Sequence, residues 1–236
     1  MHAMILAAGR GERMRPLTDH CPKPLLKAGG KPLLQWHLEA LRSVGIRQVV
    51  INHAHLGHQI ESAFGDGHAL GLHIQYSAEA SALETAGGIA KALPWLGEDP
   101  FVVINGDVSC DWPIANALAV AAAWQPGQLA HLVLVPNPVH HPQGDFALKG
   151  GLVQEGDTLP ELPRYTFSGI GVYAPALFAS VPPGGVAKLA PLLRGAMAQG
   201  KVSGELHAGF WMDVGTPQRL QELDDRLTQQ QQAGQR

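Results

Sequence analysis

The amino-terminal segment contains residues whose types and spacing suit phosphate chemistry. Gly9 and Gly11 are followed closely by Arg13 and Arg15. Glycine lets a backbone approach an anion, and arginine supplies positive charge beside it. Residues 10–31 hold six basic and two acidic side chains, although the whole chain has a net charge of −3. We therefore predict a site for a small polyanion, and the negative total argues against a general nucleic-acid or membrane binder.

Two well-known phosphate-binding motifs do not fit this segment. A dinucleotide fingerprint requires a third glycine where Met14 stands, which counts against a dehydrogenase. A P-loop requires Gly-Lys-Ser or Gly-Lys-Thr, and neither tripeptide occurs. Lys23, however, lies between Pro22 and Pro24. Because proline fixes its own φ and restricts the preceding residue, we expect the Lys23 ammonium to be held in one place.

Two aspartates form a candidate site for a divalent cation. Asp107 follows the apolar run 101–105 and Gly106, and Asp213 stands in a tight passage before the last predicted helix. Mg²⁺ binds one or two carboxylates together with phosphate oxygens and water, so this pair could hold Mg²⁺ beside a triphosphate. Taken alone, an aspartate after a glycine is more often a turn residue or a helix cap.

Strand and helix signals alternate along the first half of the chain. The predicted strands there cover residues 3–8, 47–52, 72–76 and 101–105, and the predicted helices cover 34–44, 56–64, 86–93 and 113–124. This alternation predicts an α/β fold with a doubly wound, mainly parallel, Rossmann-like mixed sheet. The less regular second half is expected to extend the same sheet. Its predicted strands are 131–135, 146–148 and 165–173, and its predicted helices are 188–199 and 217–227.

The chain is long enough for one domain with a substantial core. We predict a single domain over residues 1–228, with halves that meet near residue 125. The glutamine run 229–232 predicts a disordered end over 229–236.

Cysteine usage and the amino terminus favour a reducing cytoplasm. Cys21 and Cys110 are too few for a disulfide framework and show no metal-ligand spacing. The apolar start, residues 1–8, is short and is followed by its positive charges, so we expect no signal peptide. No apolar run approaches the length of a membrane span.

The run LAAGRGERMRPLTDHCPKPLL resembles the signature of the sugar-1-phosphate nucleotidyltransferases. The matching residues are Gly9, Gly11, Glu12, Arg13, Pro16, Leu17, Thr18, Pro22, Lys23 and Pro24. The likeness extends over essentially the whole chain. It implies a GT-A-like nucleotidyltransferase fold, with a nucleotide-binding half of about 1–125 and a sugar-binding half of about 126–228. It also implies that a sugar 1-phosphate attacks the α-phosphorus of a nucleoside triphosphate and that pyrophosphate leaves.

The same resemblance implies roles for the charged residues. The residues expected to bind the nucleotide phosphates are Gly9, Gly11, Glu12, Arg13 and Lys23. Of these, Arg13 and Lys23 are the expected catalytic residues, because fixed positive charge stabilises the reacting phosphates. Asp107 and Asp213 are the expected ligands of Mg²⁺, the implied cofactor. No nucleophilic side chain or general base is expected, since the attacking phosphate is already ionised.

Recognition of the base and the sugar is also carried over from the resemblance. Glu79 and Gly88 are expected at the base, with Glu84 as an alternative to Glu79. Each of them could equally be an ordinary residue of a surface loop. The residues expected at the sugar are Asn105, Asp145 and Gly169.

Within the family, the likeness implies uridylyl transfer from UTP to N-acetylmuramate 1-phosphate in a salvage route for peptidoglycan sugars. The alternatives are glucose, mannose or glucosamine 1-phosphate, another base, or a non-catalytic sensor of sugar nucleotides. A sensor would be expected to lack Lys23 or one of the two aspartates, and all three are present. The expected partners are therefore small molecules, with no nucleic acid and no membrane. The choice between monomer and dimer is left open.

Overall fold

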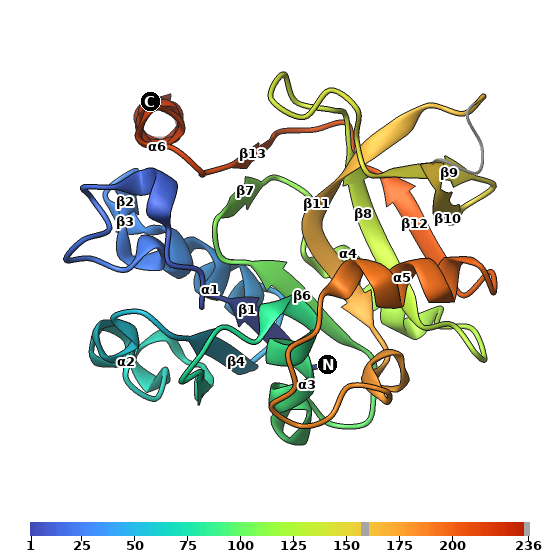
Figure 1. Ribbon diagram of the computed structural model, residues 1–236. Coiled ribbons are helices and arrows are strands. Elements are labelled where there is room, and N and C mark those ends of the chain that lie inside the picture. Colours follow the sequence, from blue (N-terminus) through green and yellow to red (C-terminus); the bar gives the residue numbers. More distant parts are fainter. Residues whose placement is uncertain (157–160, 234–236) are drawn as a thin grey trace.

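The computed structural model describes residues 1–156 and 161–233 and is built around one nine-stranded sheet (Figure 1). The strands of this sheet are β1 (Ala3–Leu6), β4 (Gln48–His53), β5 (His73–Ala78), β6 (Phe101–Asn105), β8 (Ala130–Val135), β9 (Phe146–Lys149), β10 (Leu152–Glu155), β11 (Arg164–Tyr173) and β12 (Val202–Leu206). The α-helices are α1 (Leu33–Ser43), α2 (Gly57–Phe64), α3 (Glu84–Leu96), α4 (Ala115–Ala122), α5 (Leu189–Met197) and α6 (Pro217–Ala233).

Several shorter elements accompany these. Two small sheets consist of β2 (Lys27–Ala28) with β3 (Lys31–Pro32), and β7 (Val108–Cys110) with β13 (Trp211–Asp213). The 3-10 helices are η1 (Glu12–Met14), η2 (Lys23–Leu25), η3 (His68–Leu70) and η5 (Pro175–Phe178).

The strand order across the main sheet is β5-β4-β1-β6-β11-β8-β12-β10-β9. β5, β4, β1 and β6 pair in parallel. β11 then runs antiparallel to both β6 and β8, while β12 is parallel to β8 and antiparallel to β10. The predicted α/β fold with a mixed sheet is therefore confirmed. The prediction that the sheet is mainly parallel is wrong: among the described residues four strand pairings are parallel and five are antiparallel, because the second half of the chain adds mostly antiparallel strands.

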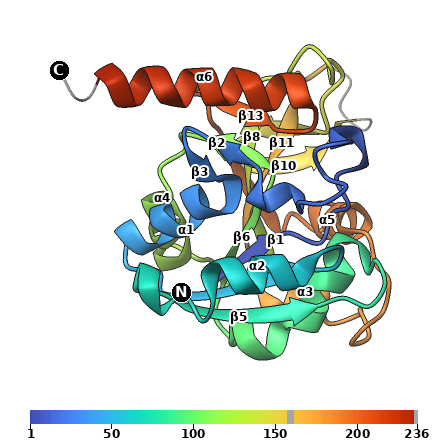
Figure 2. The same ribbon diagram turned by 90° about the vertical axis from the view of Figure 1, so that its left-hand side faces the viewer.

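Helices cover both faces of the sheet, because its central strands are apolar on both sides (Figures 1 and 2). In β1, Met4 packs in a core with residues of α3 and α5. Ala3 and Ile5 point the other way and pack with residues of α1, α2 and α4. The short apolar run of β1 thus contributes to two cores, one above and one below the sheet.

Each strand and helix that the sequence predicts is present, with ends that differ by a few residues. The sequence analysis did not predict β10, β12, which contains Gly204, or the short strands β2, β3, β7 and β13. Three residues are too few for a periodic pattern, so pairing of this kind is visible only in the folded chain.

The last helix is longer than predicted. Because α6 continues to Ala233, the prediction of disorder from residue 229 is wrong as far as residue 233, and residues 234–236 lie outside the described part. Glutamine is a good helix former, and Gln231 donates a hydrogen bond from Nε2 to the Gly29 carbonyl at 3.0 Å. Within the described residues, no helix has both the length and the apolar character needed to cross a bilayer.

Candidate active site

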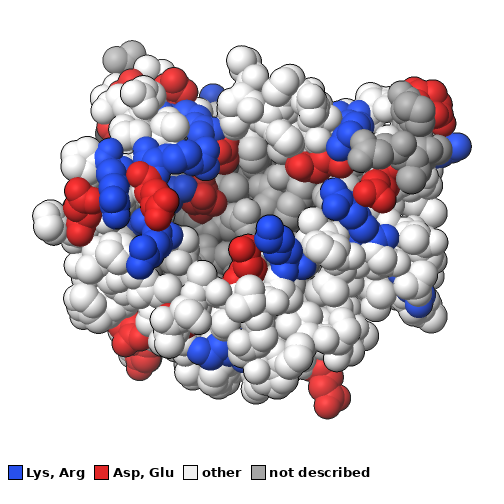
Figure 3. All heavy atoms as spheres, viewed as in Figure 1, with Lys and Arg blue, Asp and Glu red and all other residues white. Residues whose placement is uncertain are grey.

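A cavity of about 380 Å³ opens at the carboxyl ends of β1, β4 and β6. Leu6, the last residue of β1, is paired in register with Asn52 on one side and Asn105 on the other. The lining residues are Leu6, Ala7, Ala8, Gly9, Lys23, Pro24, Asn52, Glu79, Ala82, Glu84, Thr85, Asn105, Gly106 and Asp107. Open α/β sheets bind ligands at this edge. Figure 3 shows a hollow in the surface, with the largest group of Lys and Arg side chains on its left and smaller groups on its right and lower rim.

Of the two glycines in the loop after β1, Gly9 lines the cavity and Gly11 does not. Gly11 has a φ of 65°, a left-handed conformation that favours glycine, and its carbonyl accepts a hydrogen bond from Thr18 Oγ1 at 2.8 Å. Gly11, Glu12 and Arg13 do not line the cavity, and Glu12 and Arg13 are exposed on η1. Gly11 therefore shapes the loop from outside the cavity.

Lys23 is held against the cavity wall at the start of η2. Its residue exposure is only 8%, and its Nζ lies 2.5 Å from Asp107 Oδ2. The extended Pro22 precedes η2, and Pro24 lies within its first turn, so the backbone at this position is stiff. The expectation that Lys23 is fixed and shielded from bulk water is confirmed.

Asp107 and Asp213 come from distant parts of the sequence and are brought together by the small sheet of β7 and β13. Asp213 pairs in register with Val108, and the Val214 amide donates a hydrogen bond to the Asp107 carbonyl at 2.7 Å. The backbones of the two aspartates are therefore neighbours, as a shared cation requires.

Asp213 contacts one arginine and one histidine, and a second arginine lies nearby. Asp213 Oδ1 forms an ion pair with Arg219 and lies 2.8 Å from His140 Nε2. Arg13 is close as well, because the position of a Cβ at Gly215 would lie 3.2 Å from Arg13 Nη2 and 3.2 Å from Asp213 Oδ2. We call Arg13, His140, Asp213 and Arg219 the charged corner.

Glu79 is buried at the wall of the cavity, and both of its oxygens accept hydrogen bonds. Oε1 accepts from Asn52 Nδ2 at 2.7 Å, and Oε2 accepts from the Leu83 amide at 3.2 Å. Asn52 Oδ1 in turn accepts from the Ala7 amide at 2.9 Å, so this chain of contacts reaches the glycine loop. A carboxylate held on both sides presents a fixed hydrogen-bonding edge.

Gly88 lies directly behind Glu79 and Asn52. A Cβ added there would be 2.7 Å from Glu79 Oε1 and 2.9 Å from Asn52 Nδ2. The Gly88 amide belongs to the second turn of α3, where the carbonyl four residues earlier occupies it. The structure therefore places Gly88 as the residue that leaves room for Glu79 and Asn52.

Glu84, the alternative to Glu79, also lines the cavity but has a different character. It is exposed, begins α3 and has a φ of 60°, which is uncommon for a residue with a side chain. Strain of this kind is concentrated at functional sites. Both glutamates thus reach the cavity, one buried and anchored and the other exposed.

The residues expected at the sugar lie on the side of β11. A Cβ at Gly169, which has a φ of 82°, would lie 2.6 Å from Asn105 Nδ2, so glycine permits this close approach. Asp145 Oδ2 accepts a hydrogen bond from the Phe167 amide at 2.8 Å, within the irregular part of β11. Asp145 and Gly169 do not line the cavity itself.

The sequence analysis missed three residues of the site: Asn52, Arg219 and His140, which contacts Asp213 from the segment between β8 and β9. Asn52 had a usable signal, since it ends a predicted strand as Asn105 does. Arg219 had none, because only the folded position of α6 brings it to Asp213.

Burial is the main influence on the pKa of His37, which lies near Asp107. It lowers the pKa of His37 to about 4, against the opposing effects of the Asp107 carboxylate and a backbone hydrogen bond with Val108. His37 is therefore a neutral side chain beneath the site at physiological pH.

The chain matches the model of the nucleotidyl transferase family over residues 2–230 and belongs to that family of enzymes. A relative from Neisseria meningitidis serogroup B, named N-acetylmuramate alpha-1-phosphate uridylyltransferase, is 55% identical over 226 residues, which cover 94% of this chain and 96% of the relative. A protein of the same name from Caulobacter vibrioides is 36% identical over 236 residues, which cover 96% and 97%. The resemblance read from the amino-terminal run is thereby confirmed.

Solved structures agree on the fold. A Bacillus anthracis protein, assigned as a glucose-1-phosphate thymidylyltransferase, superposes with a TM-score of 0.84 over 97% of this chain and 95% of its own. Its sequence identity is 23%, so this likeness shows the α/β nucleotidyltransferase fold alone.

Proposed function

We propose that this nucleotidyltransferase transfers a uridylyl group from UTP to N-acetylmuramate 1-phosphate, giving UDP-N-acetylmuramate and pyrophosphate. The proposal rests on one observation. The expected phosphate, base, sugar and metal residues line the same cavity: Gly9, Lys23, Glu79, Asn105 and Asp107. The names and full-length similarity of the Neisseria and Caulobacter relatives support this choice of sugar and base. The reaction would belong to the salvage of peptidoglycan sugars in the cytoplasm, where nucleoside triphosphates are available.

The nucleotide is proposed to bind at the carboxyl end of β1, where the strand order of the parallel sheet reverses. β1 is followed in the sheet by β4 on one side and by β6 on the other, as in a doubly wound, Rossmann-like sheet. The cavity lies at that point, so we propose that the triphosphate lies along the Gly9 loop and the base lies against Glu79. Gly88 would act indirectly, by leaving room for Glu79 and Asn52. The carboxylate of Glu79 would accept a hydrogen bond from the base, with Glu84 at the opening.

Mg²⁺ is the proposed cofactor, and the donor set fits it. Asp107 and Asp213 offer carboxylate oxygens from neighbouring backbones, and Mg²⁺ completes its shell with phosphate oxygens and water. Lys23 and Arg219 neutralise these carboxylates in the structure. Held by these two aspartates, Mg²⁺ would supply positive charge that polarises the α-phosphate and offsets its repulsion of the attacking anion.

The side chains then perform an electrostatic role. Lys23 moves its hydrogen bond from Asp107 to the reacting phosphates, and its ammonium stabilises the charge that develops between them. Arg13, at the charged corner, neutralises the leaving pyrophosphate together with the amides of the glycine loop. The sugar phosphate is already an anion, so no side chain has to remove a proton from it.

The sugar 1-phosphate is proposed to lie on the β11 side of the cavity. Asn105 stands at the junction, where its amide could donate to a phosphate oxygen or accept from a hydroxyl. Asp145 and Gly169 are proposed to form the outer part of the sugar pocket.

A substrate panel tests the proposal. Pyrophosphate release is measured with UTP and each of the 1-phosphates of N-acetylmuramate, glucose, mannose and glucosamine, with and without EDTA. We expect the highest kcat/KM with N-acetylmuramate 1-phosphate and no release in EDTA. A higher kcat/KM with another pair would reassign the substrate. Binding of sugar nucleotide without release from any pair would favour a sensor.

A further inference from the structure

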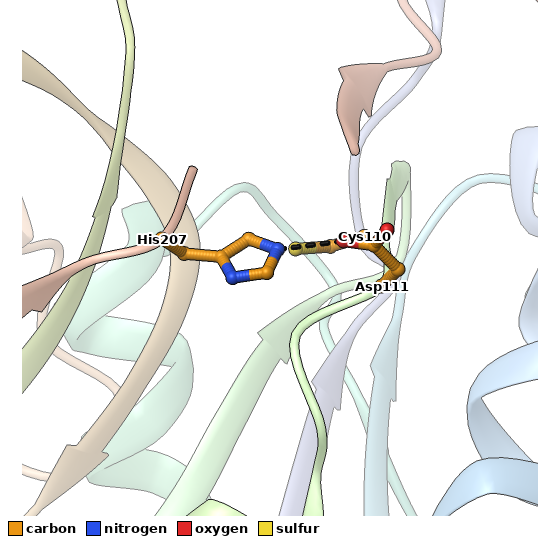
Figure 4. A group of neighbouring side chains, drawn as sticks. All are labelled: Cys110, Asp111 and His207. Atoms are coloured by element: carbon orange, nitrogen blue, oxygen red, sulfur yellow. Dashed lines mark hydrogen bonds and ion pairs between the residues drawn. The ribbon is translucent and has the colours of Figure 1, made fainter. Parts of the chain in front are cut away.

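A second group of metal-ligating side chains lies at the far end of β7 from Asp107. Cys110 ends β7, Asp111 follows it, and His207 comes directly after β12. Figure 4 shows the three side chains converging from these two segments. One sulfur, one carboxylate oxygen and one imidazole nitrogen all lie within 4.8 Å of one another. Sequence spacing could not reveal the group, because its cysteine and its histidine are far apart along the chain.

Main-chain contacts hold the two segments in place. The Asp111 amide donates to the Phe210 carbonyl at 3.0 Å, and the His207 amide donates to the Leu134 carbonyl at 2.8 Å. Gly209 leaves the space in which the side chains meet, since a Cβ there would collide with Asp111 Oδ1 and lie 2.6 Å from His207 Nε2. The group is therefore built on fixed backbone.

We propose that Cys110, Asp111 and His207 form a binding site for a thiophilic divalent cation of the Zn²⁺ class. Thiolate, imidazole and carboxylate are the ligands that Zn²⁺ uses, with water at a fourth position. Mg²⁺ prefers oxygen ligands, so this site is chemically distinct from the pair of Asp107 and Asp213.

The geometry requires only a small adjustment. Tetrahedral Zn²⁺ places its ligand atoms roughly 3.3–3.8 Å apart, as follows from its bond lengths. His207 Nε2 and Asp111 Oδ1 are now 2.6 Å apart and hydrogen-bonded. Cation binding therefore opens this contact by roughly 0.7 Å. The Cys110 thiol releases its proton to solvent, and His207 binds as the neutral imidazole with its proton on Nδ1 instead of Nε2.

A cation at this site would link two parts of the fold. Cys110 belongs to the small sheet of β7 and β13, whereas His207 extends β12 of the main sheet. Asp107 lies immediately before β7. The cation would thus stabilise β7, the strand that directly follows the proposed Mg²⁺ ligand Asp107.

Cobalt absorption tests the site in the full-length, untagged protein after chelator treatment. Co²⁺ bound to a thiolate gives a charge-transfer band and, when four-coordinate, intense visible bands. We expect one Co²⁺ to bind at this site per chain. An excess of Zn²⁺ should displace this Co²⁺, whereas an equal excess of Mg²⁺ should not. Cys110→Ser should abolish the charge-transfer band, and Cys21→Ser, the matched control at the other free cysteine, should keep it. His207→Gln should lower Co²⁺ affinity about tenfold or more.

Two further measurements keep the test decisive if Cys110→Ser is unstable. Asp111→Asn changes an exposed side chain and should weaken Co²⁺ binding in a chain with an unchanged far-UV circular dichroism spectrum. Zn²⁺ should raise the melting temperature of the parent protein more than that of Asp111→Asn. The absence of a charge-transfer band in the parent protein would overturn the proposal. So would a band that depends on Cys21, or unchanged affinity in both Asp111→Asn and His207→Gln.

Discussion

The two sides of the cavity are built in different ways. On the side of the parallel strands, Asn52 and Asn105 stand at strand ends in neighbouring register, and backbone pairing fixes their positions. At the charged corner, by contrast, Asp213, Arg219 and His140 come from β13, α6 and the segment between β8 and β9, and ion pairs join them. The paired strands hold their side chains rigidly and form what we call the wall of the cavity. At the charged corner, the side chains are held by ion pairs and can exchange these for contacts with a bound cation or phosphate.

This difference predicts two kinds of behaviour. A buried hydrogen-bonded carboxylate such as Glu79 is costly to disturb, because an unsatisfied partner remains in the interior. Partly exposed ion pairs contribute little to stability and can exchange partners when phosphates enter. Substitutions on the side of the parallel strands, around Asn52, Glu79 and Asn105, should therefore affect stability and activity together. Substitutions at the charged corner should mainly affect cation and phosphate binding.

The largest effect is expected from Lys23, which faces the cavity and contacts Asp107. Lys23→Ala should lower kcat by on the order of 10²-fold or more, the usual scale for one fixed charge donor. Pyrophosphate release under saturating substrates measures this. Lys27→Ala is the matched control, because Lys27 lies in the same segment but is exposed. Near-normal turnover in Lys23→Ala would refute its assigned role.

Gly88→Ala tests the rigidity of the wall. The added methyl group would press on Glu79 and Asn52, so we expect a loss of about 1–2 kcal/mol of unfolding free energy. KM for UTP should rise about tenfold, equivalent to about 1.4 kcal/mol of binding. Gly195→Ala is the control, since nothing lies within 4 Å of a Cβ there, and it should stabilise α5 by about 0.5–1 kcal/mol. Denaturant unfolding and steady-state kinetics check both, and equal effects of the two would contradict the assigned role of Gly88.

Acid titration of stability tests the lowered pKa of His37, a partly buried residue. The pKa of His37 is lowered to about 4, mainly by burial, so the unfolded chain binds a proton that the folded chain does not. This contribution to stability is complete above about pH 6.5 and is lost as the pH falls towards 4, with on the order of 1–2 kcal/mol lost at pH 5. His37→Gln should flatten this dependence in urea unfolding. An unchanged slope in His37→Gln would show that other groups control it.

The smallest effect is expected at the charged corner. Arg219→Ala removes a cation that competes with Mg²⁺ for Asp213, so the half-saturating Mg²⁺ concentration should fall a few-fold. The melting temperature should change little. Mg²⁺ titrations of activity measure the first quantity and thermal unfolding measures the second. A rise in the half-saturating concentration would instead mean that Arg219 holds Asp213 in its binding position.

The sequence predicted the wall of the site better than the corner. Gly9, Lys23 and Asp107 are marked by local signals: a glycine after a strand, a lysine between prolines, and an acid after a buried run. Their meeting follows from parallel strands whose carboxyl ends share one edge. Asn52 could have been found by the same rule, because it ends the predicted strand 47–52 at that edge and is the last residue but one of β4.

Local patterns alone determined the strands and helices of the first half, the position of the glycine loop and the stiffness around Lys23. Only tertiary structure decided that β11 enters antiparallel, that Asp213 pairs beside Asp107, and that α6 runs to Ala233. The reason is physical. Periodicity and turn chemistry act over a few residues, whereas strand pairing and ion pairs depend on which distant segments the folded chain brings into contact.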